Sequence, residues 1–293
     1  MLLITAAIWG FAFVAQRAGM SHMGPFLFNG LRFALGTSVL LPLAMFRRKR
    51  LSKESYPIPI RSGVLAGLVL FGGASLQQVG LVYTTAGNAG FITGLYVVLV
   101  PVLGIFRGRW PGTRTWTAAS LSVLGMFLLS GAGSSRMTGG DLIVLAGALF
   151  WAMHIRLVEK VMKVHRAIPL AVVQFSTCSL LSLLTALVFE ELSVPSVTKA
   201  WAPLLYGGVM SVGIAYTLQV AAQKKARAAH AAVIMSLEAV FAMLGGWLIL
   251  GETVVLQGII GAIIMLSAMI ISSLRRTGSG SGGRVAVTDI RVL

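Results

Sequence analysis

The second half of this chain repeats the first half at one fixed offset of 142 residues, without a gap. Trp9 falls on Trp151, and Phe33 falls on Phe175. The matched residues are few and chemically plain, so the constant register is more informative than any single identity. Each half contains five long apolar stretches. Because five is an odd number, the second half must enter a membrane upside down relative to the first, which predicts two inverted repeats.

Apolar composition determines the class of protein. Hydrophobic residues make up 57% of the 293 positions and charged residues only 11%, whereas a soluble domain carries about 25% charged residues. We therefore predict an all-α integral membrane protein with ten transmembrane helices, each near the ~20 residues that cross a ~30 Å hydrocarbon core. The ten stretches lie at 2–20, 25–46, 62–82, 88–106, 115–133, 140–158, 168–189, 203–222, 230–250 and 254–274.

Basic residues predict the orientation of these stretches. Of the 24 lysines and arginines, 20 follow the even-numbered stretches, and the others are Arg17, Arg32, Arg136 and Lys199. Because positively charged loops stay in the cytoplasm, both termini are predicted to be cytoplasmic, and we expect a multi-pass protein of a bacterial inner membrane. The net charge of +16 does not indicate nucleic-acid binding, since the cations lie in short loops and not on one face of a soluble fold.

The repeat register also predicts the domain organisation. The first five-helix repeat is expected at 1–135, the second, inverted repeat at 136–276, and a flexible cytoplasmic tail at 277–293. The single cysteine, Cys178, excludes a disulfide framework and a thiolate metal site within one chain. No cofactor or metal is expected. Paired inverted repeats are typical of secondary transporters, which hold their substrate where the repeats meet.

Three segments resemble one family. The run 237–252, LEAVFAMLGGWLILGE, resembles the signature of the EamA branch of the drug/metabolite transporter superfamily, and 7–13 and 26–33 are similar to its first-helix and second-helix motifs. The resemblance covers residues 1–274 and implies ten helices in two inverted repeats that move small metabolites, usually outward. Bacterial amino-acid exporters, including those for aromatic amino acids, are the most similar in size.

One position departs from the family pattern. Family members commonly have proline after the glutamate of the ninth helix, but this chain has Ala239 after Glu238. The usual cause of a kink beside that glutamate is therefore missing. Pro101 instead predicts a break in the fourth stretch, because proline cannot donate a helical hydrogen bond.

Polar side chains inside the third and fourth stretches of each repeat predict a cavity. A polar group in hydrocarbon loses its solvation unless it finds a partner, so these groups should face the bundle interior or water. Bonds between neighbouring helices are the alternative explanation for any one of them. We predict a substrate site between the first, third and fourth helices of the two repeats. Its predicted wall residues are Trp9, Gln77, Tyr96, Trp151, Tyr216 and Glu238, together with Gln219, His154 and Arg32.

Glu238 is the deepest acidic residue, about 12 Å from the cytoplasmic edge at ~1.5 Å per residue. A carboxylate at such a depth is expected to be protonated or paired with a cation, and His154 and Arg156 lie at a comparable depth. Three roles are open: a structural ion pair, a contact to a substrate ammonium, or a site that couples transport to a proton.

Arg32 and the two mid-membrane tryptophans are also informative. Arg32 lies about 10 Å inside the external end of its helix, and its repeat mate is Gln174. Its guanidinium could bind a substrate carboxylate bidentately, snorkel outward, or bond the carbonyl end of a neighbouring helix. Trp9 and Trp151 lie away from the interface belts where tryptophan usually occurs. They could form a flat wall for an aromatic or apolar substrate, or simply pack in the core.

The sequence therefore favours a monomeric or weakly dimeric exporter of amino acids that works by alternating access. A drug or cation exporter with Glu238 as the exchanging acid is the main alternative, and uptake of a sugar or nucleotide also remains open. An intramembrane enzyme or a lipid scramblase would belong to a different class. Enzymes need a convergent nucleophile or metal cluster, and the sequence contains no HExxH, Gly-x-Ser-x-Gly or P-loop motif.

Overall fold

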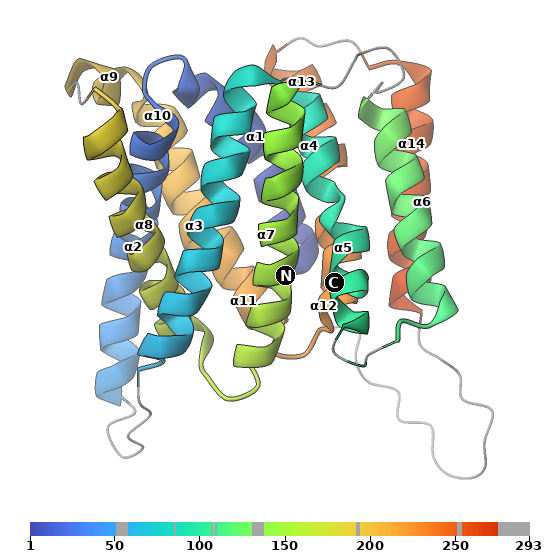
Figure 1. Cartoon of the computed structure of the whole chain (residues 1–293), viewed down its shortest axis with the longest axis horizontal. Coiled ribbons are helices and arrows are strands. Elements are labelled where there is room, and N and C mark those ends of the chain that lie inside the picture. The colour runs from blue at the N-terminus through green and yellow to red at the C-terminus, as the bar shows by residue number, and fades with distance from the viewer. Residues whose placement is uncertain are drawn as a thin grey trace.

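The chain folds into a bundle of helices that stand side by side (Figure 1). This computed structural model describes residues 1–50, 58–84, 86–106, 108, 110–130, 138–191, 194–250 and 254–274. Every regular element in these ranges is helical. The tail expected at 277–293 lies outside them.

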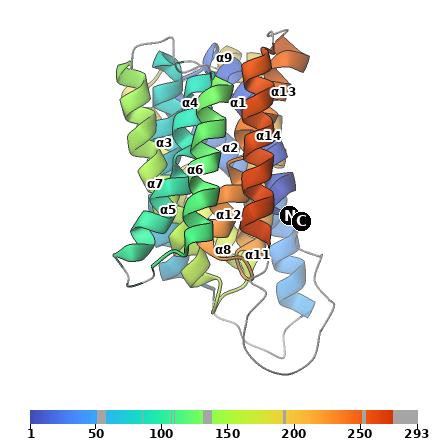
Figure 2. The same ribbon diagram turned by 90° about the vertical axis from the view of Figure 1, so that its right-hand side faces the viewer.

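The first repeat contains six helical segments, of which α4 and α5 are the two halves of one crossing. The segments are α1 (Leu2–Met20), α2 (Pro25–Arg50), α3 (Ile60–Tyr83), α4 (Ala86–Gly94), α5 (Tyr96–Ile105) and α6 (Thr113–Ser130). Among the described residues, nine stretches are long and apolar enough to cross a membrane. The tenth helix of the bundle is α6, which lies against α14 (Figure 2).

In the second repeat, two crossings are assembled from several segments. The segments are α7 (Gly139–Val161), α8 (Ala167–Phe189), α9 (Val194–Lys199), α10 (Trp201–Leu205), the wide π-helix η1 (Tyr206–Tyr216), α11 (Thr217–Ala222), α12 (Ala228–Met235), α13 (Glu238–Leu250) and α14 (Leu256–Ser273). One crossing is α10, η1 and α11 in series, and another is α12 followed by α13. The short helix α9 connects α8 to α10.

The two repeats run in opposite directions, as the odd number of stretches predicts. In Figure 1, α1 rises from the N mark toward the upper end of the bundle, whereas its repeat mate α7 descends from the upper end. The lower end carries Lys163, Lys224 and Lys225 in the turns after α7 and α11, and we call it the basic face. The upper end, which carries Glu190 at the end of α8, is called the opposite face.

Two crossings are broken at positions that the repeat register relates. Leu95 separates α4 from α5, and its repeat mate Leu237 lies in the gap between α12 and α13. At each leucine the backbone N–H donates to a carbonyl three residues earlier, over 3.1 Å to Ile92 and 3.3 Å to Ile234. A tight 3₁₀ turn inside a crossing is typical of a hinge.

These breaks correct the expectation about proline. Pro101 lies within α5 and does not end it; the crossing is broken instead at Leu95, before α5 begins. The ninth crossing is broken although Ala239 replaces the family's proline. The bend therefore depends on the tight turn that the two repeats share, and not on a missing proline N–H.

Two contacts join residues to their own repeat mates. The Tyr96 hydroxyl donates to Oε1 of Glu238 over 3.0 Å, and the rings of Phe33 and Phe175 lie 6.0 Å apart between centroids. Both pairs are separated by 142 positions. Under a two-fold relation, a residue can touch its own mate only near the axis. The pseudo-two-fold axis therefore passes through the Tyr96–Glu238 bond and through the Phe33–Phe175 contact.

Glycine allows the closest helix contacts, as is usual in membrane bundles. A Cβ at Gly10 of α1 would lie 2.4 Å from the Cβ of Phe241 and 2.6 Å from the carbonyl oxygen of Glu238. A Cβ at Gly125 of α6 would lie 2.6 Å from the carbonyl oxygen of Gly261 in α14. These two glycines therefore hold α1 against α13 and α6 against α14.

We expect Gly10→Ala to destabilise the protein by about 1–3 kcal/mol, because the added methyl group overpacks the contact between α1 and α13. The measurement is the temperature at which the detergent-purified protein loses its monodisperse size-exclusion peak. Gly90→Ala is the matched control, since a Cβ there meets nothing within 4 Å. Equal melting temperatures for the two variants would contradict the close packing of α1 on α13.

Candidate functional site

A narrow cavity lies in the middle of the bundle, where crossings of both repeats meet. Its lining includes all but one of the predicted wall residues, and His154 is the exception. The lining residues are Trp9, Phe13, Gln16, Arg32, Gln77, Thr93, Tyr96, Trp151, Ile155, Ser211, Tyr216, Gln219 and Glu238. The volume available to water is about 30 Å³, which is room for about two water molecules. A solute as large as an amino acid requires these side chains to move.

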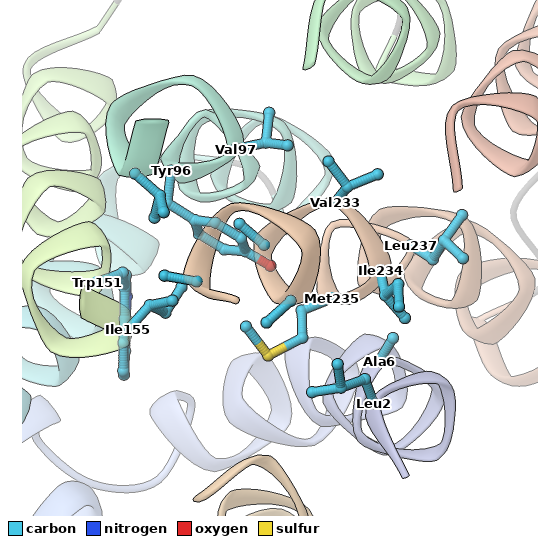
Figure 3. Close-up of a cluster of buried hydrophobic side chains, with 14 of the residues drawn as sticks. Leu2, Ala6, Tyr96, Val97, Trp151, Ile155, Val233, Ile234, Met235 and Leu237 are labelled. Carbon is cyan, nitrogen blue, oxygen red and sulfur yellow. The ribbon is translucent and has the colours of Figure 1, made fainter. Parts of the chain in front are cut away.

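Apolar side chains pack around this cavity. Figure 3 shows Tyr96 reaching from α5 toward the α12–α13 segment, while Trp151 and Ile155 project from α7. Met235 of α12 lies between that segment and α1 in the same view. These residues belong to one buried cluster, so the polar groups of the cavity are surrounded by a rigid apolar shell.

Glu238 is held at the start of α13, directly after the break in its crossing. Its side chain is only 4% exposed, and it accepts the hydrogen bond from Tyr96. The expected partners lie elsewhere: His154 bonds Gln174 over 3.1 Å, and Arg156 is 3.8 Å from Glu159. The sequence placed His154 and Arg156 at a depth similar to that of Glu238, but the depth of a residue does not determine the direction in which its side chain points. Glu238 therefore faces the cavity with a hydroxyl partner, and in the described part of the chain no ion pair to it is found.

Arg32 projects from α2 into the same cavity and is 3% exposed. Its guanidinium carbon lies 5.1 Å from the ring centroid of Phe33 and 5.7 Å from that of Phe28. Its Nε has no hydrogen-bond partner, and the described part of the chain contains no ion pair to it. The guanidinium does not snorkel to the surface. It is a buried cation that is stabilised by aromatic faces and retains a free donor at Nε.

Tyr216 is the centre of an aromatic cluster beside Arg32. Its ring lies 4.5 Å from Trp9, 6.0 Å from Trp151, 5.7 Å from Phe175 and 5.9 Å from Phe33, measured between centroids. Such pairs contribute about 0.5–1.5 kcal/mol each beyond the area they bury. The cluster therefore fixes the apolar wall of the cavity.

Two glutamines that are repeat mates have different partners. Gln77 accepts a 2.7 Å hydrogen bond at Oε1 from Nε1 of Trp151. The corresponding bond from Trp9 to Gln219 is missing, because Nε1 of Trp9 donates to the carbonyl oxygen of Ser211 over 3.4 Å. The Oε1 atom of Gln219 is buried and has no partner. The amide oxygen of Gln77 is therefore occupied by its bond to Trp151, whereas the amide oxygen of Gln219 is a free acceptor in the cavity wall.

His154 is fully buried outside the cavity lining. Its ring lies 6.2 Å from that of Trp151 and 6.5 Å from that of Tyr216. The bond to Gln174 holds it in place. His154 supports the aromatic wall from behind, so a direct contact to a substrate has no support in this geometry.

Five lining residues were absent from the predicted wall: Phe13, Gln16, Thr93, Ile155 and Ser211. Helical spacing would have found three of them. Phe13 and Gln16 follow Trp9 at i+4 and i+7 on α1, and Ile155 follows Trp151 at i+4 on α7. Thr93 of α4 lies just before the turn at Leu95 and is buried in the cavity wall. Ser211 lies in the π-helix η1, which no sequence pattern indicated.

The groups that line the candidate site are mostly polar and aromatic side chains. Among the described residues, no group of three His, Cys, Asp or Glu side chains could hold a metal ion. The described lining combines the guanidinium of Arg32, the carboxyl group of Glu238 and the free amide oxygens of Gln16 and Gln219 with aromatic walls. Such a set can bind a small solute that carries both charges.

Comparisons with known proteins find transporters among the proteins similar to this chain. A protein of Archaeoglobus fulgidus named as an uncharacterized transporter is 33% identical over 276 residues, which cover 94% of this chain and 85% of that protein. The threonine/homoserine exporter RhtA of Salmonella typhimurium is 28% identical over 260 residues, covering 85% of this chain and 80% of the exporter. One crystal structure superposes with a TM-score of 0.77 at 19% identity and covers 93% of this chain and 95% of its own, which shows a shared fold.

A family model matches the chain twice, over residues 1–131 and again over 138–274. Its description is the EamA-like transporter family. The two matches follow one another along the chain and together span almost all of the helical bundle. This protein belongs to the EamA-like transporter family and is a multi-pass membrane transporter.

Proposed function

We propose that this transporter exports amino acids by alternating access, with the cavity around Arg32 and Glu238 as its substrate site. One observation carries the proposal: a buried guanidinium without an acidic partner lines the same small cavity as a buried carboxyl group. An amino acid carries a carboxylate and an ammonium on one carbon. It is therefore the smallest common solute that supplies both missing partners.

Each charged end of an amino acid has a partner in the cavity. The planar guanidinium of Arg32 can donate two parallel hydrogen bonds to a carboxylate. The free Oε1 of Gln219 and the carboxyl group of Glu238 can accept from an ammonium. The relative named as a threonine/homoserine exporter supports the same substrate class.

Arg32 also argues against the cation-exporter alternative. A solute with only a positive charge would gain from Glu238 but would face an uncompensated guanidinium in the same low-dielectric cavity, and like charges at short range repel strongly there. A zwitterion balances both groups. The geometry therefore favours an amino acid over a purely cationic drug.

We further propose that the basic face lies in the cytoplasm of a bacterial cell, with both termini on that side of the inner membrane. The predominance of Lys and Arg in the loops of this face supports this orientation. The tight turns at Leu95 and Leu237 are the proposed hinges. Because they flank the Tyr96–Glu238 bond, a substrate that engages Glu238 would loosen a contact between the repeats, which links binding to movement.

The direct test is a transport screen with the purified protein in liposomes. Vesicles preloaded with one unlabelled amino acid are offered the same amino acid in labelled form, and threonine and homoserine are tested first. We expect saturable counterflow of at least one amino acid and none of its decarboxylated amine. Failure of the whole amino-acid set, together with counterflow of a permanently cationic dye, would reject the proposal.

We expect Arg32→Gln to weaken amino-acid binding about 10- to 100-fold, since a hydrogen bond to a charged group contributes about 1.5–3 kcal/mol. Discrimination between threonine and 1-amino-2-propanol, which lacks the carboxylate, should fall by a similar factor. Arg32→Lys keeps the charge but loses the planar fork, so it should restore only part of the discrimination. Unchanged discrimination in Arg32→Gln would show that the guanidinium has only a structural role.

We expect Glu238→Gln to reduce the rate of amino-acid counterflow at least about ten-fold, because an amide cannot neutralise an ammonium. Tyr96→Phe removes only the hydroxyl donor and should have a milder effect, about two- to ten-fold for one hydrogen bond. Counterflow is measured across a pH series for the wild type and both variants. A wild-type rate for Glu238→Gln at every pH would exclude Glu238 from both substrate binding and proton coupling.

A further inference from the structure

A wide vestibule opens on the basic face, below the central cavity. Its volume available to water is about 640 Å³, so it can admit a whole amino acid while the central cavity is narrow. Segments of three regions line it: the end of α5 with the turn that follows, the end of α7, and the turn between α11 and α12.

The lining of this vestibule is strongly cationic. Lys163, Lys224, Lys225 and Arg227 all line it, and all four side chains are exposed. Among the described lining residues the single acidic one is Glu159, which is 3.8 Å from Arg156. No ion pair involves the four exposed cations in the described part of the chain. A concave surface lined by one sign of charge concentrates ions of the opposite sign.

The fold itself does not require these cations. At the related positions of the first repeat, on the opposite face, Ser21 is the mate of Lys163, Val82 that of Lys224, and Tyr83 that of Lys225. Basic loops set the orientation of a membrane protein, but orientation depends on their number and not on their gathering in one concavity. The clustering therefore calls for a second explanation.

The amide oxygen of Gln223 is a free hydrogen-bond acceptor that lies beside the cations, on the side of the vestibule nearer the central cavity. Gln223 lines the vestibule and is 2% exposed, and its Oε1 has no partner. Its Nε2 donates over 2.9 Å to the carbonyl oxygen of Ile155, a residue of the central cavity. Gln219, whose Oε1 is also free, lies one helical turn earlier. Two unpartnered amide oxygens about 6 Å apart along the axis thus connect the vestibule with the central cavity.

We propose that this vestibule is a capture site for carboxylates: the cluster of Lys163, Lys224, Lys225 and Arg227 binds the carboxylate of a free amino acid, and Gln223 accepts from its ammonium before the central cavity admits it. The inference rests on the proposed function for the identity of the solute. The oxyanion chemistry is shared with the phosphate of an anionic lipid headgroup, and the experiments separate the two sources.

The first experiment measures binding without transport, using malonate as the carboxylate probe. Trp110 lines the vestibule and is 80% exposed, so its fluorescence reports occupancy, and Trp110→Phe identifies its share of the signal. We expect saturable malonate binding that is weakened at least about five-fold in the Lys224→Gln/Lys225→Gln variant, because local enrichment of anions follows local charge. The matched control is Arg61→Gln/Lys160→Gln, which removes two exposed cations of the same face outside the vestibule and should bind like the wild type.

The second experiment measures threonine uptake into inside-out vesicles. We expect malonate to inhibit this uptake, and we expect the Lys224→Gln/Lys225→Gln variant to resist that inhibition. Gln223→Met should weaken the apparent affinity for threonine but leave malonate binding unchanged, since malonate has no ammonium. A general folding defect would not produce this separation.

The third experiment measures malonate binding in liposomes of different lipid composition. Malonate binding of similar strength in liposomes of zwitterionic lipid, with or without anionic phospholipid, supports capture of a free carboxylate. Loss of binding whenever anionic phospholipid is present would assign the vestibule to a lipid headgroup and overturn the proposal. Absence of malonate binding in the wild type, or equal binding in the double variant, would also overturn it. Malonate binding without transport of any amino acid would instead reject the proposed function and leave an anion site.

Discussion

The hydrogen bond between Tyr96 and Glu238 is the contact on which the architecture depends, because it joins two residues that occupy the same position in the two repeats. A polar group in the interior of a membrane bundle must be satisfied within the protein. Here a phenol of one repeat satisfies a carboxyl group of the other. Each repeat therefore supplies a hydrogen-bond partner for a buried polar group of the other. Without that partner, burying the fourth helix of either repeat would leave a polar group unsatisfied.

The repeats share a backbone, but they differ in the side chains that face the cavity. Arg32 has Gln174 as its mate, and Tyr96 has Glu238. Gln77 and Gln219 are identical in type, yet only Gln77 is bonded to a tryptophan. Tyr96 and Glu238 satisfy each other, whereas Nε of Arg32 and Oε1 of Gln219 remain without a partner in the cavity. In the proposed function, the symmetric fold would provide the two-state movement and the asymmetric side chains would provide the binding chemistry.

Much of the fold follows from the sequence, because a constant register and apolar stretches of membrane length leave few alternatives. Trp9 and Trp151 line the central cavity, and their helical position alone determines the direction in which they face. His154 lies outside the lining, because its orientation depends on its bond to Gln174. The turns at Leu95 and Leu237 were also missed: Gly94 precedes the first, but glycine is common throughout the bundle, and the second, from Ile234 to Leu237, contains neither proline nor glycine. Packing of the opposed repeats selects these turns, and a single chain carries no local signal for that.

The same register relates two layers that close the central cavity on its two sides. Toward the opposite face, Phe13 and Leu81 belong to one buried apolar cluster. Their mates toward the basic face are Ile155 and Gln223, which share a hydrogen bond. Separating Phe13 from Leu81 in water would expose two large apolar side chains, at about 1.5–3 kcal/mol for each. Separating Ile155 from Gln223 would expose one such side chain and break a hydrogen bond that contributes only about 0.5–1.5 kcal/mol. The layer on the basic face is therefore the easier one to open, and the wide vestibule already lies directly outside it. Under the proposed function, easier opening on the basic face would suit an exporter. After it releases its solute outside, the empty transporter must open again toward the cytoplasm, where the next solute is collected.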